Sequence, residues 1–481
     1  MTWNRRVWKQ CFLVALFAWG CMWSARSVAQ SGDPCVDGKR RALVLSGGGS
    51  KGAFETGAIY HLVVQRHCDF HEFSGVSVGA LNGAFLAQAA PSQDPSESFG
   101  NLAARTEGLV SLWQSVKSAK DIRKARRLAM ARFGLFGAES LSDFGPLRQL
   151  LDRNISIEKL AEGRPVRAGV VSFWSGSYRE VLAQPLIAKA GARSFMEYLF
   201  ASSVPPVYGK LPRIADGSMA DDPKLWSQFS DGSLRHITPV ASYFKTCGSD
   251  TYDPAHADAA CPSNSVFAAP PHSPVEQLFV IVTSPYARNS DSMPPMEAGC
   301  CRPGRHQITD GRKILGRTIA LMDDAVYRSD LDFLYFANDL LRWRRQTYEQ
   351  ITLNSDPGKL AETRRQFMGS NGFAFESYNR DPQDADAPSR PYEIGLVIPD
   401  REFADPEHLL VITPAIIREQ LLSGCLAADA MMQRDFHLSS MADQCAQRFP
   451  SGVPNAMASR EFVAPSPKRT GELAARGSAA N

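Results

Sequence analysis

The sequence lacks the features that would mark a fibrous, metal-binding or nucleic-acid-binding protein. Its 481 residues contain no internal repeat, no Cys-x-x-Cys pair and no group of Cys and His at the spacing of zinc ligands. A solenoid and a zinc site are therefore disfavoured, and we expect neither a metal nor another cofactor. Basic residues number 53 and acidic residues 50, which is too even a balance to indicate a nucleic-acid partner.

The longest apolar stretch near the N-terminus is too short for a membrane span. Residues 11–23 are apolar apart from Gly20, follow three basic residues and precede the small residues 27–29. A membrane helix needs about 20 apolar residues, whereas this pattern is typical of a cleaved export signal. We expect residues 1–29 to be a signal peptide and the mature protein to be periplasmic, outer-membrane-associated or secreted. A lipidated Cys21 and an uncleaved anchor are the alternatives.

Eight of the ten cysteines lie beyond this leader. An even number of cysteines in an exported protein indicates disulfide bonds. Cys247 with Cys261 and Cys425 with Cys445 are plausible local pairs, although the spacing does not fix the connectivity. Without the leader the chain has 49 basic and 50 acidic residues, so no strongly charged partner is indicated.

Short apolar runs alternate with helical patterns along the first part of the chain. Strands are expected at residues 41–45, 71–76, 166–173 and 277–283, and helices at 52–63, 80–90, 99–130 and 313–350. This alternation predicts an α/β fold with a mostly parallel central sheet and helices on both faces.

Composition divides the rest of the chain. Residues 246–273 are rich in Pro, Ala and Asp and are expected to form a surface insertion with two cysteines. Residues 351–425 are expected to form a C-terminal extension packed on the core. Residues 451–481 are polar and rich in Ala, Gly and Pro, which predicts a disordered tail.

A glycine-rich loop follows the first expected strand and begins a helix. Residues 46–52 read SGGGSKG. Glycines let several backbone N–H groups approach one point, and the helix N-terminus adds positive potential there. Such a loop can bind a phosphate or the oxyanion of an acyl-transfer intermediate. It also matches the G-x-G-x-x-G pattern of dinucleotide sites, so alone it does not distinguish these functions.

A second motif places a serine between a strand and a helix. Residues 75–79 read GVSVG, at the end of an apolar run and before Ala80. This is the nucleophile-elbow pattern, in which Gly75 and Gly79 leave room for a sharp turn that exposes Ser77. A dinucleotide site has no need of such a turn, so the pair of motifs favours acyl transfer.

A third motif offers a base. Asp231 is followed by Gly232 and Ser233, with Pro239 further on. A serine hydroxyl needs a base within hydrogen-bonding distance, and a buried carboxylate can serve if its pKa rises toward neutrality. Asp-Gly is also a common turn, so this motif alone has little weight.

In combination the three motifs resemble the patatin-like phospholipase family. The resemblance covers residues 40–350, which we expect to form the catalytic domain with a three-layer patatin-like fold. It implies a Ser–Asp dyad that cleaves acyl esters of phospholipids and related lipids. The implied catalytic residues are Ser77 and Asp231, and the implied oxyanion loop is Gly47, Gly48 and Gly49. The supporting motif positions are Lys51, Gly52, Gly75, Gly79 and Gly232.

Two departures and two alternatives accompany this resemblance. The family usually has Asp-Gly-Gly, whereas Ser233 stands in the third position here, and a second Asp-Gly-Ser begins at Asp216. Only Asp231 has a proline eight residues later. A Ser-His-Asp esterase would use His236 or His256 as the base. A non-catalytic protein that binds lipid or phosphate would keep the glycine loop but not need the serine.

The expected partner is a phospholipid or another lipid ester. A basic segment within residues 117–130 also carries apolar side chains, among them Ile122. This segment is a candidate for peripheral contact with an anionic membrane surface, and a solvated helix face is the alternative.

Overall fold

The computed structural model describes residues 33–125, 139–190, 192–215, 226–244, 275–285, 311–370, 377–379, 381, 383–384, 387–400 and 412–450. The expected signal peptide, the insertion at 246–273 and the tail at 451–481 lie outside these residues. So do Asp216, His256 and the cysteine pair Cys247–Cys261.

An eight-stranded sheet forms the centre of the fold, with the order β10-β9-β1-β2-β5-β8-β7 and with β6 paired to β5. The strands are β1 (Arg41–Leu45), β2 (Glu72–Val76), β5 (Val166–Ser172), β6 (Tyr178–Leu182), β7 (Arg213–Ile214), β8 (Ser227–Asp231), β9 (Gln277–Ile281) and β10 (Glu393–Val397). Strands β10, β9, β1, β2 and β5 are parallel, whereas β6 and β8 are antiparallel to β5. The mostly parallel sheet expected from the sequence is confirmed.

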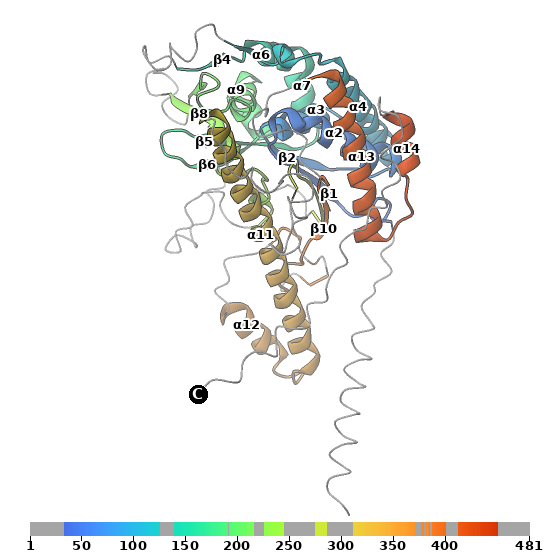
Figure 1. Ribbon diagram of the computed structural model, residues 1–481. Helices are drawn as coiled ribbons and strands as arrows, with labels where there is room; N and C mark the ends of the chain where they lie inside the picture. Colours follow the sequence, from blue (N-terminus) through green and yellow to red (C-terminus); the bar gives the residue numbers. More distant parts are fainter. Residues whose placement is uncertain are drawn as a thin grey trace, which may run out of the picture.

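Helices cover both faces of this sheet, which confirms the three-layer architecture (Figure 1). Leu43 and Leu45 of β1 belong to one hydrophobic cluster, and Ala42 and Val44 to the other, as the two-residue period of a strand requires. The first cluster includes side chains from α2 (Gly52–Tyr60), α3 (Val78–Ala87), α4 (Pro95–Ser115), α6 (Gly145–Asn154), α7 (Ile157–Glu162), α8 (Ala183–Ala190), α9 (Ala192–Ser202), α13 (Pro414–Phe436) and α14 (Ala442–Arg448). The second packs against α11 (Gly311–Asn354), beside whose far end lies α12 (Leu360–Ser370).

The prediction of a continuous helix over residues 99–130 is wrong for residues 116–125, and residues 126–130 lie outside the described part of the chain. Helix α4 ends at Ser115 because Val116 is extended. Ser118 then begins a 3-10 turn through a capping box with Asp121. The short strands β3 (Lys124–Ala125) and β4 (Ser142–Asp143) pair beyond it. The β-branched Val116 and the capping residue Ser118 therefore end the helix at a point where the hydrophobic periodicity alone predicted that it would continue.

The C-terminal part of the described chain packs on the helix that follows the glycine loop. Helix α13 crosses α2 so closely that a Cβ added to Gly57 would lie 2.0 Å from the Leu421 carbonyl oxygen. A Cβ added to Gly424 would lie 1.9 Å from the carbonyl oxygen of Phe54. The expected limit of the extension near residue 425 falls inside α13, and the described residues continue to 450.

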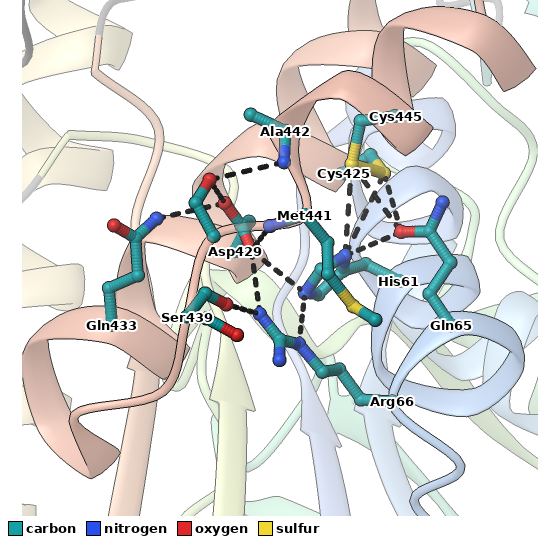
Figure 2. A network of polar contacts seen from close by, with 11 residues as sticks. His61, Gln65, Arg66, Cys425, Asp429, Gln433, Ser439, Met441, Ala442 and Cys445 are labelled. Carbon is teal, nitrogen blue, oxygen red and sulfur yellow. Dashed lines mark hydrogen bonds and ion pairs between the residues drawn. A yellow bond between two sulfur atoms is a disulfide. The ribbon is translucent and has the colours of Figure 1, made fainter.

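Figure 2 shows how α13 and α14 are joined to the π-helical turn His61–Gln65, which follows α2, and to Arg66 after it. Cys425 and Cys445 form a disulfide, as expected from the sequence, and a second disulfide joins Cys35 to Cys68. Asp429 of α13 accepts hydrogen bonds from Arg66 at 2.9 Å and from the Met441 backbone N–H at 2.8 Å. These bonds satisfy a buried carboxylate and anchor both helices.

His61 lies inside this cluster, 3.7 Å from the Cys445 sulfur. Burial lowers the pKa of His61 to about 4, so its ring is neutral at pH 7. The two cysteine sulfurs beside it are joined to each other. Within the described ranges, no helix combines the length and hydropathy needed to cross a bilayer.

The contact between α2 and α13 predicts a large loss of stability for Gly424→Ala. The added methyl group has no space against the Phe54 carbonyl, so the helices must separate at a cost of about 2–3 kcal/mol. Urea unfolding followed by circular dichroism measures the change. Gly100→Ala is the matched control: Gly100 lies in α4 with open space around its Cβ position, so this variant should gain up to about 1 kcal/mol. Equal effects in both variants would contradict the packing argument.

Candidate functional site

Ser77 occupies a strained turn between β2 and α3. Its φ of 53° and ψ of −126° are unusual for a residue with a side chain. A Cβ at Gly75 would lie 2.4 Å from the Gly79 backbone, and a Cβ at Gly79 would lie 2.5 Å from the Leu45 carbonyl oxygen. Both glycines are therefore required by close backbone contacts. The Ser202 hydroxyl holds the turn: it accepts from the Ser77 N–H at 2.9 Å and donates to the Gly169 carbonyl at 2.7 Å.

The pairing of β5 brings Asp231 to Ser77. Val170 pairs with both Arg179 of β6 and Asp231 of β8, so β6 and β8 lie at opposite edges of β5. Gly169 pairs with both Glu180 of β6 and Val76 of β2, so β2 also lies opposite β6. Strands β2 and β8 therefore share one edge of β5, and their carboxyl ends meet there. The residue after Val76 is Ser77, which places it beside Asp231.

The Asp231 carboxylate is buried, and burial raises its pKa to about 6. Hydrogen bonds from the Ser233 backbone N–H, at 2.9 Å, and from the Ser77 and Ser233 hydroxyls partly offset this rise. The backbone N–H of Asp231 donates to the Val204 carbonyl at 3.2 Å. The site thus contains a serine hydroxyl hydrogen-bonded to a carboxylate whose pKa lies near neutrality.

The glycine loop is fixed by elements from distant parts of the chain. The Gly47 N–H donates to the Ile237 carbonyl at 2.8 Å, and the Gly47 carbonyl accepts from the hydroxyls of Thr283, at 2.8 Å, and Tyr327. Gly48 and Gly49, with φ of 58° at Gly49, begin the 3-10 turn Gly49–Lys51. The first N–H groups of a helical turn have no acceptor within it, so these two amides suit an external oxyanion.

The remaining motif positions have structural roles. The Lys51 ammonium is buried and donates to the Ser284 hydroxyl at 2.9 Å. A Cβ at Gly52 would meet Val78 and Trp113, so this glycine lets α2 approach α3 and α4. A Cβ at Gly232 would lie 2.6 Å from the Gly169 carbonyl oxygen, which accounts for the Asp-Gly turn against β5.

His236, the base of the alternative triad, is hydrogen-bonded to another carboxylate. Its Nδ1 lies 2.6 Å from Asp330 Oδ1 of α11, and its ring packs edge-on against Tyr178 with 4.6 Å between centroids. Asp330 also accepts from the Thr238 N–H at 2.8 Å. This pair fixes the segment after the Asp231 turn to α11.

Three residues outside the expected set of site residues contribute to the site. Ser202 and Thr283 hold the backbone of the serine turn and of the glycine loop. Ser233 contacts both Asp231 and the glycine loop. Its backbone N–H donates to the Asp231 carboxylate, and its hydroxyl lies so close to Gly47 that a Cβ added there would be 2.3 Å from the hydroxyl oxygen. Ser233 is marked in the sequence only by its place in the Asp-Gly-Ser motif, and no pattern in the sequence distinguishes Thr283.

An apolar cavity that is partly open to solvent adjoins Ser77. It lies between α3, α4 and α6, and Ile412 before α13 also lines it. The side chains that line it include Phe85, Leu109, Trp113, Leu147 and Leu151. The Trp113 indole N–H donates to Asn82 at 3.0 Å, which fixes the ring in the wall.

One comparison with known proteins, the match to a family model, agrees with this geometry. Residues 43–243 match the family model described as Patatin-like phospholipase. No curated protein matches the chain. A matching solved structure is the crystal structure of VipD from Legionella pneumophila, with 13% identity, a TM-score of 0.23, and coverage of 40% of this chain and 46% of that chain. The chain thus spans less than half of that protein. Residues 43–243 are thus similar to the patatin-like phospholipase family, and this match supports lipid acyl hydrolase activity in general.

Proposed function

We propose that this protein is an esterase of the phospholipase A or lysophospholipase kind, which cleaves lipid acyl esters through an acyl-enzyme on Ser77. The observation that carries the proposal is the hydrogen bond between Ser77 and the buried Asp231 beside an apolar cavity. A hydroxyl paired with a near-neutral carboxylate suits nucleophilic attack, and the cavity suits an alkyl chain.

In the proposed reaction, Asp231 accepts the Ser77 proton as the Ser77 oxygen attacks the ester carbonyl. With a pKa of about 6, the carboxylate is mostly ionised at pH 7 and still basic enough to take part. The N–H groups of Gly48 and Gly49 would donate to the oxyanion of the tetrahedral intermediate. Each such donor is typically worth about 3 kcal/mol. Protonated Asp231 then returns the proton to the departing alcohol, and water cleaves the acyl-enzyme by the same steps.

We further propose that the mature protein is exported. The disulfides Cys35–Cys68 and Cys425–Cys445 are compatible with an oxidising compartment. The leader pattern at residues 1–29 supports the same proposal from the sequence.

The dyad predicts that Ser77→Ala and Asp231→Asn both abolish hydrolysis of p-nitrophenyl butyrate, with losses of about 1,000-fold or more. His236→Ala should lose no more than about tenfold, through packing against Tyr178. A fluorophosphonate probe should label the wild type at Ser77, which a non-catalytic lipid-binding protein would not allow. Circular dichroism confirms folding. An inactive His236→Ala beside an active Asp231→Asn would replace the dyad with a triad.

Ser233 predicts a shift in the pH profile. Its hydroxyl bonds to the Asp231 carboxylate and lowers the Asp231 pKa, so Ser233→Ala should raise that pKa. The base must be ionised, so activity is lost as pH falls through the pKa of Asp231. The acid limb of kcat/KM should therefore move from near pH 6 to higher pH, by about one unit. An unchanged acid limb in active Ser233→Ala would mean that another group controls it.

The cavity predicts acyl-chain selectivity that Leu147 controls. Leu147→Trp adds an indole inside the cavity and should exclude long acyl chains more than short ones, because long chains need more of its space. The ratio of kcat/KM for p-nitrophenyl palmitate to that for the butyrate should fall about tenfold or more. Leu186→Met is the control, since Leu186 is buried outside the cavity wall. An equal loss on both esters would indicate general damage instead.

A further inference from the structure

The hairpin between β5 and β6 exposes two large aromatic side chains. Phe173 is 49% exposed and Trp174 is 96% exposed. The backbone that carries them is ordered by hydrogen bonds from the Phe173 N–H to the Gln228 carbonyl and from the Gly176 N–H to the Ser172 carbonyl, both 2.8 Å. An exposed tryptophan on a turn that is fixed by hydrogen bonds is typical of a surface that binds an apolar partner.

This hairpin lies next to the Ser77–Asp231 pair. Val170 is paired with Asp231, and Phe173 lies three residues further along the chain, about 10 Å beyond it. Leu234, in the turn that follows Asp231, is 48% exposed. The exposed side chains of Phe173, Trp174 and Leu234 therefore lie at the same edge of the sheet as Asp231, where the proposed reaction would take place.

A chain of backbone contacts continues from here to the basic segment. The Val204 carbonyl accepts from Asp231, and Val207 shortly after it is 46% exposed. The Val207 carbonyl accepts from the Leu141 N–H at 2.8 Å, just before β4. Strand β4 pairs with β3, which contains Lys124.

The basic segment borders the cavity. Val116 and Ile122 line the cavity, and Lys117 and Lys120 lie between them in the sequence with exposed side chains. Its acidic neighbour Asp121 accepts hydrogen bonds from the backbone N–H groups of Lys117, at 2.8 Å, and Ser118, at 2.9 Å. Exposed cations beside an apolar opening complement a surface that is both anionic and apolar.

We propose that these side chains form one docking face for an anionic lipid surface, namely Phe173, Trp174, Val207 and Leu234 with Lys117, Lys120 and Lys124. The aromatic side chains enter the headgroup region, and the lysines remain beside the lipid phosphates. The proposal rests on the proposed function, because the face would bring the cavity to the lipid from which it takes an acyl chain.

Vesicle binding tests this proposal without depending on catalysis. The protein carries Ser77→Ala throughout, and its partitioning is measured by co-sedimentation with vesicles of phosphatidylcholine, alone or with about 30% phosphatidylglycerol. Trp174→Ala should weaken binding to the mixed vesicles about tenfold. Lys117→Ala, Lys120→Ala and Lys124→Ala together should weaken it about a hundredfold and remove the preference for phosphatidylglycerol. The matched control is Trp343→Ala, since Trp343 is 50% exposed in the second half of α11, a helix that runs away from β8 (Figure 1).

The outcomes separate the docking face from the proposed activity. With Ser77 restored, the Trp174 and lysine variants should hydrolyse monomeric p-nitrophenyl butyrate at the wild-type rate. Failure of the wild type on that ester would refute the proposed function and leave the binding data to be judged alone. Equal binding by all variants, or equal losses for Trp174→Ala and Trp343→Ala, would refute the docking face. A fall in molecular mass by light scattering for Trp174→Ala, with unchanged vesicle binding, would assign the face to a second copy of the chain instead.

Discussion

The site depends on the way in which β5 shares one of its edges between two strands. The first half of that edge pairs with β2 and the last part with β8, so two strands of opposite direction meet end to end. Each ends in a functional group, Ser77 from β2 and Asp231 from β8. The same arrangement buries the carboxylate, and burial raises its pKa to about 6. The pairing of β5 therefore determines both where Asp231, the proposed base, lies and how high its pKa is.

The rest of the molecule holds this junction rigid. The glycine loop is fixed by Thr283 after β9 and Tyr327 on α11, which follow it by more than 200 residues in the sequence. Helix α2, which begins at the loop, is packed against α13 without space for a side chain at Gly57. Oxyanion donors are effective only when they are oriented before the reaction. The long-range contacts of the loop would meet this requirement for the proposed donors at Gly48 and Gly49.

The proposed reaction and the proposed docking face lie at the same edge of the sheet. The cavity beside Ser77 is apolar, and exposed aromatic side chains lie beyond Asp231 on the β5–β6 hairpin. A substrate that is insoluble in water must pass from a lipid phase into the protein, so apolar contact outside the cavity reduces the cost of that transfer. The proposed docking face and the proposed reaction are consistent with one lipid substrate.

The sequence alone determined the features that are local in the chain. The apolar runs defined β1, β2, β5 and β9 to within two residues, and the glycine spacing identified the two turns, because strands and glycine turns are encoded by neighbouring residues. The family resemblance added the expected partnership of Ser77 with Asp231. Only the tertiary structure decided that β8 shares an edge with β2, that His236 pairs with Asp330, and that Ser202, Ser233 and Thr283 support the site. Apart from the bond between Ser233 and Asp231, those contacts join residues that lie far apart in the chain. They depend on strand order and packing, which local sequence does not encode.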